Sequence, residues 1–214
     1  RVDAMATMVG VLQAEIASLK QIIATPPSYV SSSSAAVQVG NSALCPSGTT
    51  AFTAMFFFRM TAAQLTVTQY PFTAGTQYPD YPADAARGKS WELRMLAGSH
   101  GLVSPNGGIY HKSQYVYASN SNQHAMFPNA LVADQWHHLT FTYNGFDTVV
   151  YIDGAVLVTE TGWNPSPNIE CGDVYVGSRF GSNVFPGDLA GIRYWHGTAL
   201  TVAQVILWKN FTQP

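Results

Sequence analysis

The hydrophobic period of this chain changes once, at Pro26-Pro27, and that change limits what the chain can fold into. Upstream of the prolines, apolar residues are spaced alternately three and four apart, as on one face of a helix. Downstream of residue 35 they alternate with polar residues, as they do in strands. Because proline cannot continue a helix, we expect a helix over residues 1–25, a Pro/Ser linker over 26–35 and a β domain over 36–214.

The N-terminal segment has the heptad pattern of an α-helical coiled coil, with apolar residues at the a and d positions. An isolated helix of this length is only marginally stable in water, and Gly10 costs it about 1 kcal/mol relative to alanine. We therefore expect the helix to associate with copies of itself. The residues of this expected oligomerisation seam are Val2, Met5, Val9, Leu12, Ile16, Leu19 and Ile23.

Two features of the heptad pattern disagree about the number of chains. β-Branched residues at a with leucine at d favour a dimer. Met8 and Ile22 widen the apolar stripe, which favours a larger bundle. The alternative to any oligomer is an amphipathic helix that packs on its own β domain.

The rest of the chain is typical of an all-β fold. We expect strands over residues 52–60, 65–70, 91–96, 136–144, 149–153, 155–159, 174–176 and 189–196. Apolar residues on both faces of 52–60 indicate a central strand, and Asp153-Gly154 is a strong type I′ hairpin signal. One helix is expected, over residues 201–209 with Thr201 as its N-cap. Many short strands separated by Gly, Pro and Asn predict an antiparallel β-sandwich or jelly roll.

Charge and hydropathy exclude two classes of partner. Charged residues make up 10% of the 214 residues and the net charge is −2, against about 25% charged residues in an average globular protein. Lys and Arg form no runs, so we expect no nucleic-acid partner. The densest apolar run, residues 54–58, is too short to cross a bilayer, so we expect no membrane insertion. A neutral, hydroxyl-rich composition suits an extracellular or virion surface.

The chain shows no signal peptide and begins in helical register at Arg1, so we expect it to be a piece of a longer protein. Its cysteines, Cys45 and Cys171, lack the spacing of a zinc ribbon. A disulfide between them would close a long loop and stabilise the fold by about 3–5 kcal/mol. The alternative is two buried thiols, and the sequence leaves both open.

Four motifs in the same order resemble the concanavalin A-like superfamily, which includes laminin G-like and pentraxin-like domains. They are QWHHLTFTYNG (135–145) with VYIDG (150–154), VYVG (174–177), FPGDLAGIRYW (185–195), and the closing segment that starts at Leu200-Thr201. Residues 52–60 match an early strand of the family. The resemblance covers about residues 36–210 and implies a concanavalin A-like jelly roll.

One departure from the family pattern bears on metal binding. Ala190-Gly191 replaces the family's usual acidic pair, and Asp188 is shifted. Calcium sites need clustered carboxylates and carbonyls, whereas Asp80, Asp84 and Asp173 are scattered along the sequence. We therefore expect no cofactor, and calcium is left open without support.

Catalytic residues are not recognisable in the sequence. Glycosidases of the superfamily need two carboxylates about 5–9 Å apart, but Glu92 is alone on its strand and Glu170 and Asp173 lie near a turn. His137 and His138 are neighbours on a strand, so their side chains point to opposite faces and cannot chelate one ion. We expect His137 to be a satisfied core or edge histidine, and the chain not to be an enzyme.

Two long segments, residues 70–89 and 105–129, are rich in tyrosine, asparagine and charge, and we expect them to form rim loops. Aromatic rings stack on sugars, and amides and carboxylates bind hydroxyls. Alternatively, the tyrosines pack the loops onto the sandwich or fill a subunit interface, and Tyr115 and Tyr117 are simply strand residues. The candidate ligand-binding residues are Tyr78, Asp80, Tyr81, Asp84, Arg87, Tyr110, His111, Tyr115, Tyr117, Asn120, Asn122 and His124.

A coiled coil that leads into a lectin-like head resembles the tips of viral or phage fibres and of trimeric bacterial adhesins. That resemblance implies a homotrimer, which we favour over a dimer, and a cell-surface glycan or glycoprotein as ligand. Our first hypothesis is therefore attachment. The alternatives are a structural domain that caps or assembles a fibre without an external ligand and, disfavoured by the missing carboxylate pair, a polysaccharide hydrolase.

Overall fold

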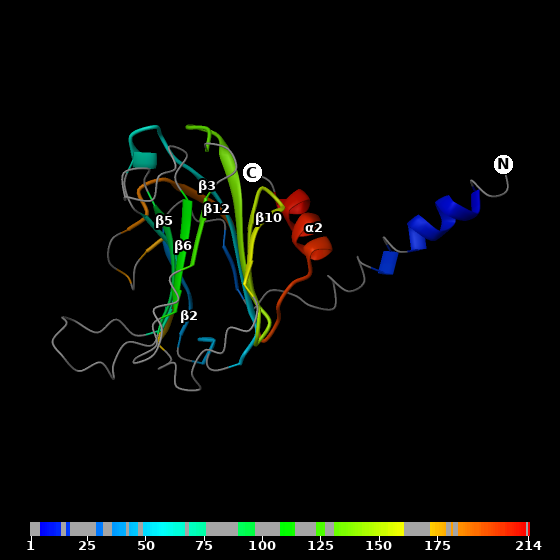
Figure 1. Ribbon diagram of the computed structural model, residues 1–214, viewed down its shortest axis with the longest axis horizontal. Helices are drawn as coiled ribbons and strands as arrows, with labels where there is room; N and C mark the ends of the chain where they lie inside the picture. Colours follow the sequence, from blue (N-terminus) through cyan, green and yellow to red (C-terminus); the bar gives the residue numbers. More distant parts are fainter. Residues whose placement is uncertain are drawn as a thin grey trace.

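Two six-stranded antiparallel sheets face each other across a hydrophobic core in the computed structural model of the chain (Figure 1). This confirms the predicted all-β sandwich. The structure describes residues 5–13, 16–17, 29–31, 36–41, 43–46, 49–66, 69–75, 90–96, 108–113, 123–126, 131–160, 172–178, 181, 184–212 and 214.

Sheet A contains, in spatial order, β1 (Tyr29–Ser31), β12 (Asp188–His196), β3 (Phe52–Arg59), β8 (Trp136–Tyr143), β9 (Thr148–Ile152) and β10 (Ala155–Glu160). Sheet B contains β2 (Val37–Gly40), β11 (Asp173–Val176), β4 (Gln69–Gly75), β5 (Ser90–Leu96), β6 (Gly108–Ser113) and β7 (Gln123–Met126). Outside the sheets lie a 3₁₀ turn, η1 (Gln64–Thr66), and a helix, α2 (Val202–Thr212).

Aromatic residues from both sheets fill the core. Phe52 of sheet A stacks on Phe72 of sheet B with ring centroids 5.7 Å apart, and Phe141 meets Phe52 edge-on at 5.3 Å. Every residue of 52–58 is buried, because one face of β3 lines this core and the other lies under α2. The prediction of a central strand with two apolar faces is therefore confirmed.

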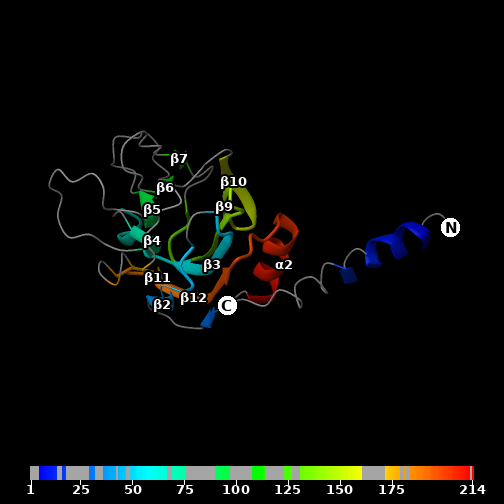
Figure 2. The same ribbon diagram turned by 90° about the horizontal axis from the view of Figure 1, so that it is seen from below.

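Helix α2 covers the outer face of sheet A (Figure 2). Val205 packs there with Met55 and Trp195 in a second apolar cluster. The N-terminus of α2 is capped as predicted: Thr201 Oγ1 accepts a 3.4 Å hydrogen bond from the backbone N of Gln204, whose Oε1 accepts one from Thr201 N at 2.8 Å. This reciprocal pair is a capping box.

The turn between β9 and β10 also follows the prediction. Asp153 and Gly154 have φ values of 53° and 84°, both in the left-handed region that a type I′ turn requires. Lys209 of α2 donates a 2.8 Å hydrogen bond from Nζ to the carbonyl oxygen of Asp153. The turn is thus tied to the C-terminal half of the helix.

The structure corrects three sequence-based boundaries. Residues 64–66 form η1 and the next strand begins at Gln69, so the strand expected over 65–70 is displaced. Thr61 explains the displacement, because its backbone N and hydroxyl exchange hydrogen bonds with Gln64 and close a local turn. Residues 105–129 contain β6 and β7 instead of one long loop. The segment expected as a linker contains β1, which pairs with β12.

Residues 5–13 and 16–17 are helical. Figures 1 and 2 both show this helix clear of the sandwich, on the side that α2 covers. Its seam residues are exposed, Met5 at 67% and Leu12 at 50%, so the helix does not pack on its own head along the part that the structure describes. Val2, Leu19 and Ile23 lie outside the described residues. Among the described residues, no helix has the length and apolar character needed to span a membrane.

Candidate functional site

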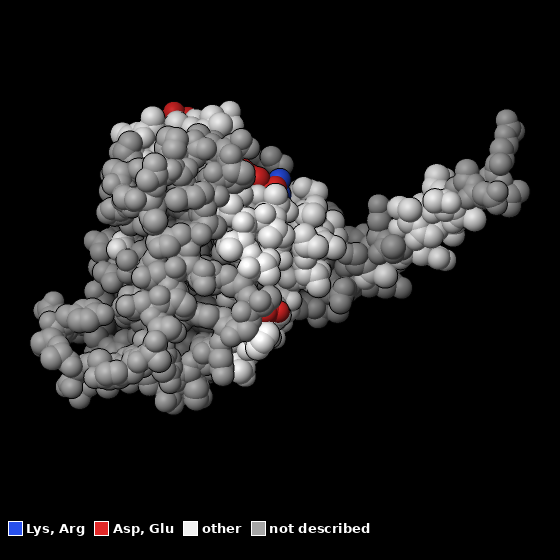
Figure 3. All heavy atoms as spheres, viewed as in Figure 1, with Lys and Arg blue, Asp and Glu red and all other residues white. Residues whose placement is uncertain are grey.

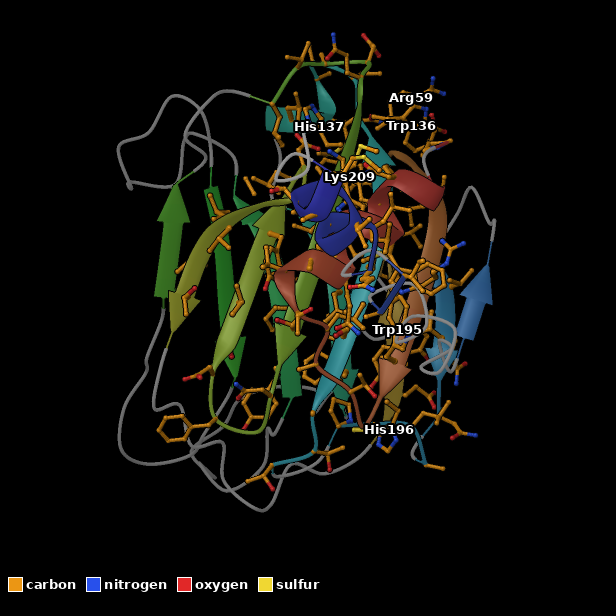
Figure 4. All side chains as sticks on the ribbon, turned by 90° about the vertical axis from the view of Figure 1, so that its right-hand side faces the viewer. Arg59, Trp136, His137, Trp195, His196 and Lys209 are labelled. Atoms are coloured by element: carbon orange, nitrogen blue, oxygen red, sulfur yellow. The ribbon has the colours of Figure 1, made fainter. Side chains whose placement is uncertain are left out.

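The two sandwich faces differ in what covers them. On the outer face of sheet A, Trp208 of α2 meets Trp195 edge-on with ring centroids 5.4 Å apart. Arg193 reaches over the Trp208 ring, with its guanidinium carbon 5.3 Å from the centroid. Figure 4 views this side, with α2 lying across the sheet. Helix α2 therefore occupies part of the outer face of sheet A.

Strand register places Tyr110 and His124 together on the outer face of sheet B. Tyr110 pairs with His124 on one side and with Arg94 on the other, so the three positions form a row across β5, β6 and β7. Leu93 is fully buried in the core, and successive strand positions alternate between faces. Arg94 therefore belongs to the outer face, and the row that contains it does too.

His111 does not share this face. It pairs with Leu93 in register, which places it at an inward position of β6. The sequence-based set thus mixes the two faces of one strand, because it was drawn from a segment expected to be a loop. The remaining candidates lie outside the described residues: Tyr78, Asp80, Tyr81, Asp84, Arg87, Tyr115, Tyr117, Asn120 and Asn122.

A second row on this face is polar along its whole length, and sequence reasoning missed it. Paired positions run across β2, β11, β4, β5 and β6, and their residues are Gln38, Tyr175, Thr73, Glu92 and Lys112. Gln38, Tyr175, Thr73 and Glu92 each have apolar neighbours on both sides in their strands, so the signal in the sequence is period-two alternation combined with the strand order. Amide, hydroxyl, carboxylate and ammonium groups in one row can bind a hydroxyl-rich ligand.

Part of this polar row is covered by the segment that follows β11. Thr73 is buried, and its hydroxyl donates a 3.0 Å hydrogen bond to the carbonyl oxygen of Ser178. Tyr175 donates a 3.0 Å hydrogen bond from its hydroxyl to Asp173, and burial together with this bond raises the pKa of the tyrosine. The row continues from these covered positions to Glu92 of β5 and Lys112 of β6.

A network on sheet A holds the β9–β10 turn. His137 Nδ1 lies 2.9 Å from Asp153 Oδ2, and the backbone N of His138 donates to Asp153 Oδ1 at 2.8 Å. The hydrogen bond to Asp153 raises the pKa of His137. Burial raises the pKa of Asp153, but the hydrogen bonds from His137 and from the His138 backbone outweigh it and lower the pKa overall. His137 is thus a satisfied edge histidine, as predicted.

Carboxylates do not gather in the described part of the chain. Asp188 accepts hydrogen bonds from Arg59 Nε at 2.9 Å and Nη2 at 2.7 Å. Among the described residues, no group of three or more His, Cys, Asp or Glu side chains could hold a metal ion. Glu170, Asp80, Asp84 and Cys171 lie outside those residues, and Cys45 is buried in the core, so the Cys45–Cys171 disulfide stays a prediction.

A family model described as the concanavalin A-like lectin/glucanases superfamily matches residues 31–206. The chain therefore belongs to this superfamily, as its motifs and its two-sheet fold indicate. A search of curated protein sequences finds no relative.

Three solved structures have a similar fold. A heptameric SAP-like pentraxin from Limulus polyphemus is 19% identical (TM-score 0.55, covering 85% of this chain and 78% of the pentraxin). Domain 4 of the extracellular arabinanase AbnA from Geobacillus stearothermophilus, in complex with arabinotriose, is 16% identical (TM-score 0.54; 81% and 71%). The CBM40 of Ruminococcus gnavus IT-sialidase, bound to α2,3 sialyllactose, is 11% identical (TM-score 0.53; 84% and 95%). At these identities the similarity concerns the fold.

Proposed function

We propose that this chain is the head and part of the stalk of an oligomeric attachment protein, which binds a cell-surface glycan or glycoprotein without catalysing a reaction. One observation carries the proposal: the polar rows of sheet B lie on the face opposite α2 and the N-terminal helix (Figures 1 and 2). If the N-terminal helix attaches the head to a stalk on the sheet A side, the outer face of sheet B points away from the stalk, toward a target surface.

The chemistry of the surface supports a neutral, hydroxyl-rich ligand. In the view of Figure 3, most of the described atoms belong to uncharged residues, with a few acidic side chains and a basic one beside an acidic one. The candidate rows themselves combine Tyr110 with the charged residues Glu92, Arg94 and Lys112, and aromatic and charged groups of this kind can hold a hydroxyl-rich ligand. Two of the similar structures, the AbnA domain and the CBM40, hold bound sugars, and we extend sugar binding to this chain as part of the proposal.

Oligomerisation through the N-terminal seam would make weak individual sites effective. Met5, Leu12 and Ile16 are exposed in the single chain and require a partner to be buried. We favour a homotrimer over a dimer. Heads that bind one surface together gain avidity of about 10²–10⁴-fold over a single site. This arrangement suits a viral or phage fibre or a bacterial adhesin, at an extracellular or virion surface.

A paired measurement tests the proposal. Sedimentation equilibrium gives the number of chains in the oligomer, and a glycan array with host-cell binding gives the ligand. We expect Tyr110→Ala and Arg94→Ala to reduce binding at least tenfold while the oligomer stays intact. Phe146→Ala is the matched control, because Phe146 is 58% exposed on the β8–β9 connection, outside the candidate rows.

Two outcomes would contradict attachment. If the alanine variants lose the oligomer and binding together, Tyr110 and Arg94 lie in a subunit interface and the head caps or assembles a fibre. If wild-type protein binds no glycan on the array and no host surface, the head has no external ligand of the proposed class.

A further inference from the structure

His138 is a buried histidine that the proposed binding face does not use. It pairs with Phe57 in register, and the neighbouring Leu139 lies in the core, so His138 is on the outer face of sheet A. Its side chain is 0% exposed, and its ring centroid lies 4.8 Å from that of Phe57. Helix α2 packs on this face, and the charge of its Lys209 acts on His138.

Neither ring nitrogen of His138 has a hydrogen-bond partner among the described residues. Thr140, two positions along the same face, likewise has a buried Oγ1 without a partner. Buried polar groups are almost always hydrogen-bonded, so such exceptions require an explanation. A neutral imidazole tolerates this environment, whereas an imidazolium needs acceptors for two N–H groups.

Two nearby cations oppose the protonation of His138, and one carboxylate, Asp153, favours it. Lys209 approaches from α2 and Arg193 from β12, while β3 contributes the uncharged Phe57. Asp153, in the β9–β10 turn, is the one nearby carboxylate among the described residues, and both of its oxygens are already engaged by His137 and by the His138 backbone. Burial and then the charge of Lys209 lower the pKa of His138. The charge of Asp153 raises it, Arg193 lowers it further, and the pKa of His138 falls to about 3 overall.

Lys209 and Trp208 both connect this end of α2 to sheet A. Lys209 is tied to the turn by its 2.8 Å hydrogen bond to the Asp153 carbonyl oxygen, and Trp208 meets Trp195 edge-on. A positive charge on His138 repels Lys209 directly. Because His138 is 0% exposed, water can hydrate its imidazolium only after some covering group moves.

We propose that α2 is an acid-released cover: protonation of His138 frees the helix from sheet A and exposes the apolar cluster beneath it. That cluster contains Met55, Tyr151 and Trp195. His137 acts in the opposite sense, because its proton strengthens the contact with Asp153. The β9–β10 turn therefore stays in place while the helix leaves.

Proton linkage fixes the sign of the effect. An imidazole released into water protonates near its ordinary pKa of about 6.5, whereas the covered ring resists protonation until about pH 3. The covered state is therefore fully favoured above about pH 6.5 and loses its advantage as the pH falls. Between about pH 6.5 and pH 3, the ratio of chains with α2 released to chains with α2 in place rises by up to about tenfold for each unit that the pH falls.

Hydrogen exchange read by mass spectrometry on the full chain tests this. At pH 7.5, 5.5 and 4.5, corrected for intrinsic exchange rates, we expect the amides of α2 to lose protection about tenfold per pH unit below 6.5. Those of β3 and β8 should stay protected. In His138→Phe, which cannot be charged, the protection of α2 should not change over this range. His137→Gln is the matched control, and its α2 should respond to acid as the wild type does.

Two results would overturn the inference. One is parallel loss of protection in α2, β3 and β8, which indicates global unfolding. The other is an acid response of α2 in His138→Phe equal to that of the wild type. Because the phenylalanine variant can fail to fold, the imidazole of His138 should also be titrated by NMR in the wild-type chain. A His138 that gains its proton near pH 6.5 while α2 remains protected contradicts the proposal equally.

Discussion

His137 and Asp153 are joined across the β8–β9–β10 region by a 2.9 Å contact between Nδ1 and Oδ2. Asp153 also occupies the first left-handed position of the type I′ turn. One residue therefore sets the turn conformation, orients His137 and accepts the backbone N–H of His138. This links the tightest turn of sheet A to the strand beside it.

Replacing Asp153 by asparagine separates these roles. Asparagine tolerates the left-handed conformation, so the turn should persist, but the charge on the carboxylate is lost. We expect Asp153→Asn to lower the free energy of unfolding by about 1 kcal/mol at pH 6, because hydrogen bonds to a charged group are stronger than those between neutral groups. The effect is no larger because the Asp153 side chain is 45% exposed, and solvent weakens the interaction. Urea denaturation measures this. An unchanged midpoint would show that the contact contributes nothing.

The same pair predicts a pH dependence. The hydrogen bond to Asp153 raises the pKa of His137 in the folded state. Its stabilisation is then fully present below the unfolded pKa of about 6.5 and is lost as the pH rises through the folded value. The difference in stability between wild type and Asp153→Asn should therefore be larger at pH 5.5 than at pH 8.5. A difference that grows with pH would contradict this assignment.

Gly187 allows β12 to begin beside the end of β3. A Cβ atom there would collide with the backbone carbonyl oxygen of Arg59 and lie 2.8 Å from Met60 Cγ. Overpacking of this kind costs about 2–3 kcal/mol, so Gly187→Ala should lower the thermal midpoint markedly. Gly197→Ala is the control: no atom lies within 4 Å of its added Cβ, and only its φ of 77° is strained. That control should cost about 1 kcal/mol, and equal losses would refute the collision.

Arg59 joins three strands at one end of sheet A. Its guanidinium donates to Asp188 of β12, and the guanidinium carbon lies 4.9 Å above the Trp136 ring of β8. Lysine keeps the charge but loses the planar group. Arg59→Lys should cost about 0.5–1 kcal/mol, a small value because both side chains of the ion pair are more than 40% exposed. A double-mutant cycle with Asp188→Asn isolates the pair, and a coupling energy of zero would argue against it.

Gly10 offers a test of the proposed oligomer. It lies within the helical residues 5–13, and nothing is within 4 Å of an added Cβ. Alanine should stabilise the helix by about 1 kcal/mol per chain. If helix formation is coupled to assembly, Gly10→Ala should lower the dissociation constant of the oligomer in sedimentation equilibrium. An unchanged constant would separate the helix from assembly.

Local chemistry explains why much of the fold could be predicted from the sequence. The Asp153-Gly154 turn, the Thr201 cap and the alternation of 52–60 are each decided by residues close together in the chain. Pairing between strands that are distant in the sequence is not decided by such local residues. Strand β1 is only three residues long and is formed by its pairing with β12, so no periodicity could reveal it.

The candidate site was less predictable, because it also depends on pairing between strands that are distant in the sequence. The polar row from Tyr175 to Lys112 exists because strands far apart in the chain are neighbours in sheet B. Residue type alone drew attention to Tyr110 and His111 equally. Only the register with Leu93 places them on different faces. The period-two pattern of β5 was recognised, but its pairing partners were not.

The short pairing of β1 with β12 has a mechanical consequence. Tension applied to the N-terminal helix enters the sandwich through Tyr29–Ser31, whose partners Tyr194, Arg193 and Ile192 belong to the strand beside β3. Three residue pairs thus join the segment under tension to β12, which lies beside the buried strand β3. The joint can peel away before the core is loaded, so the head can survive a pull that extends its tether.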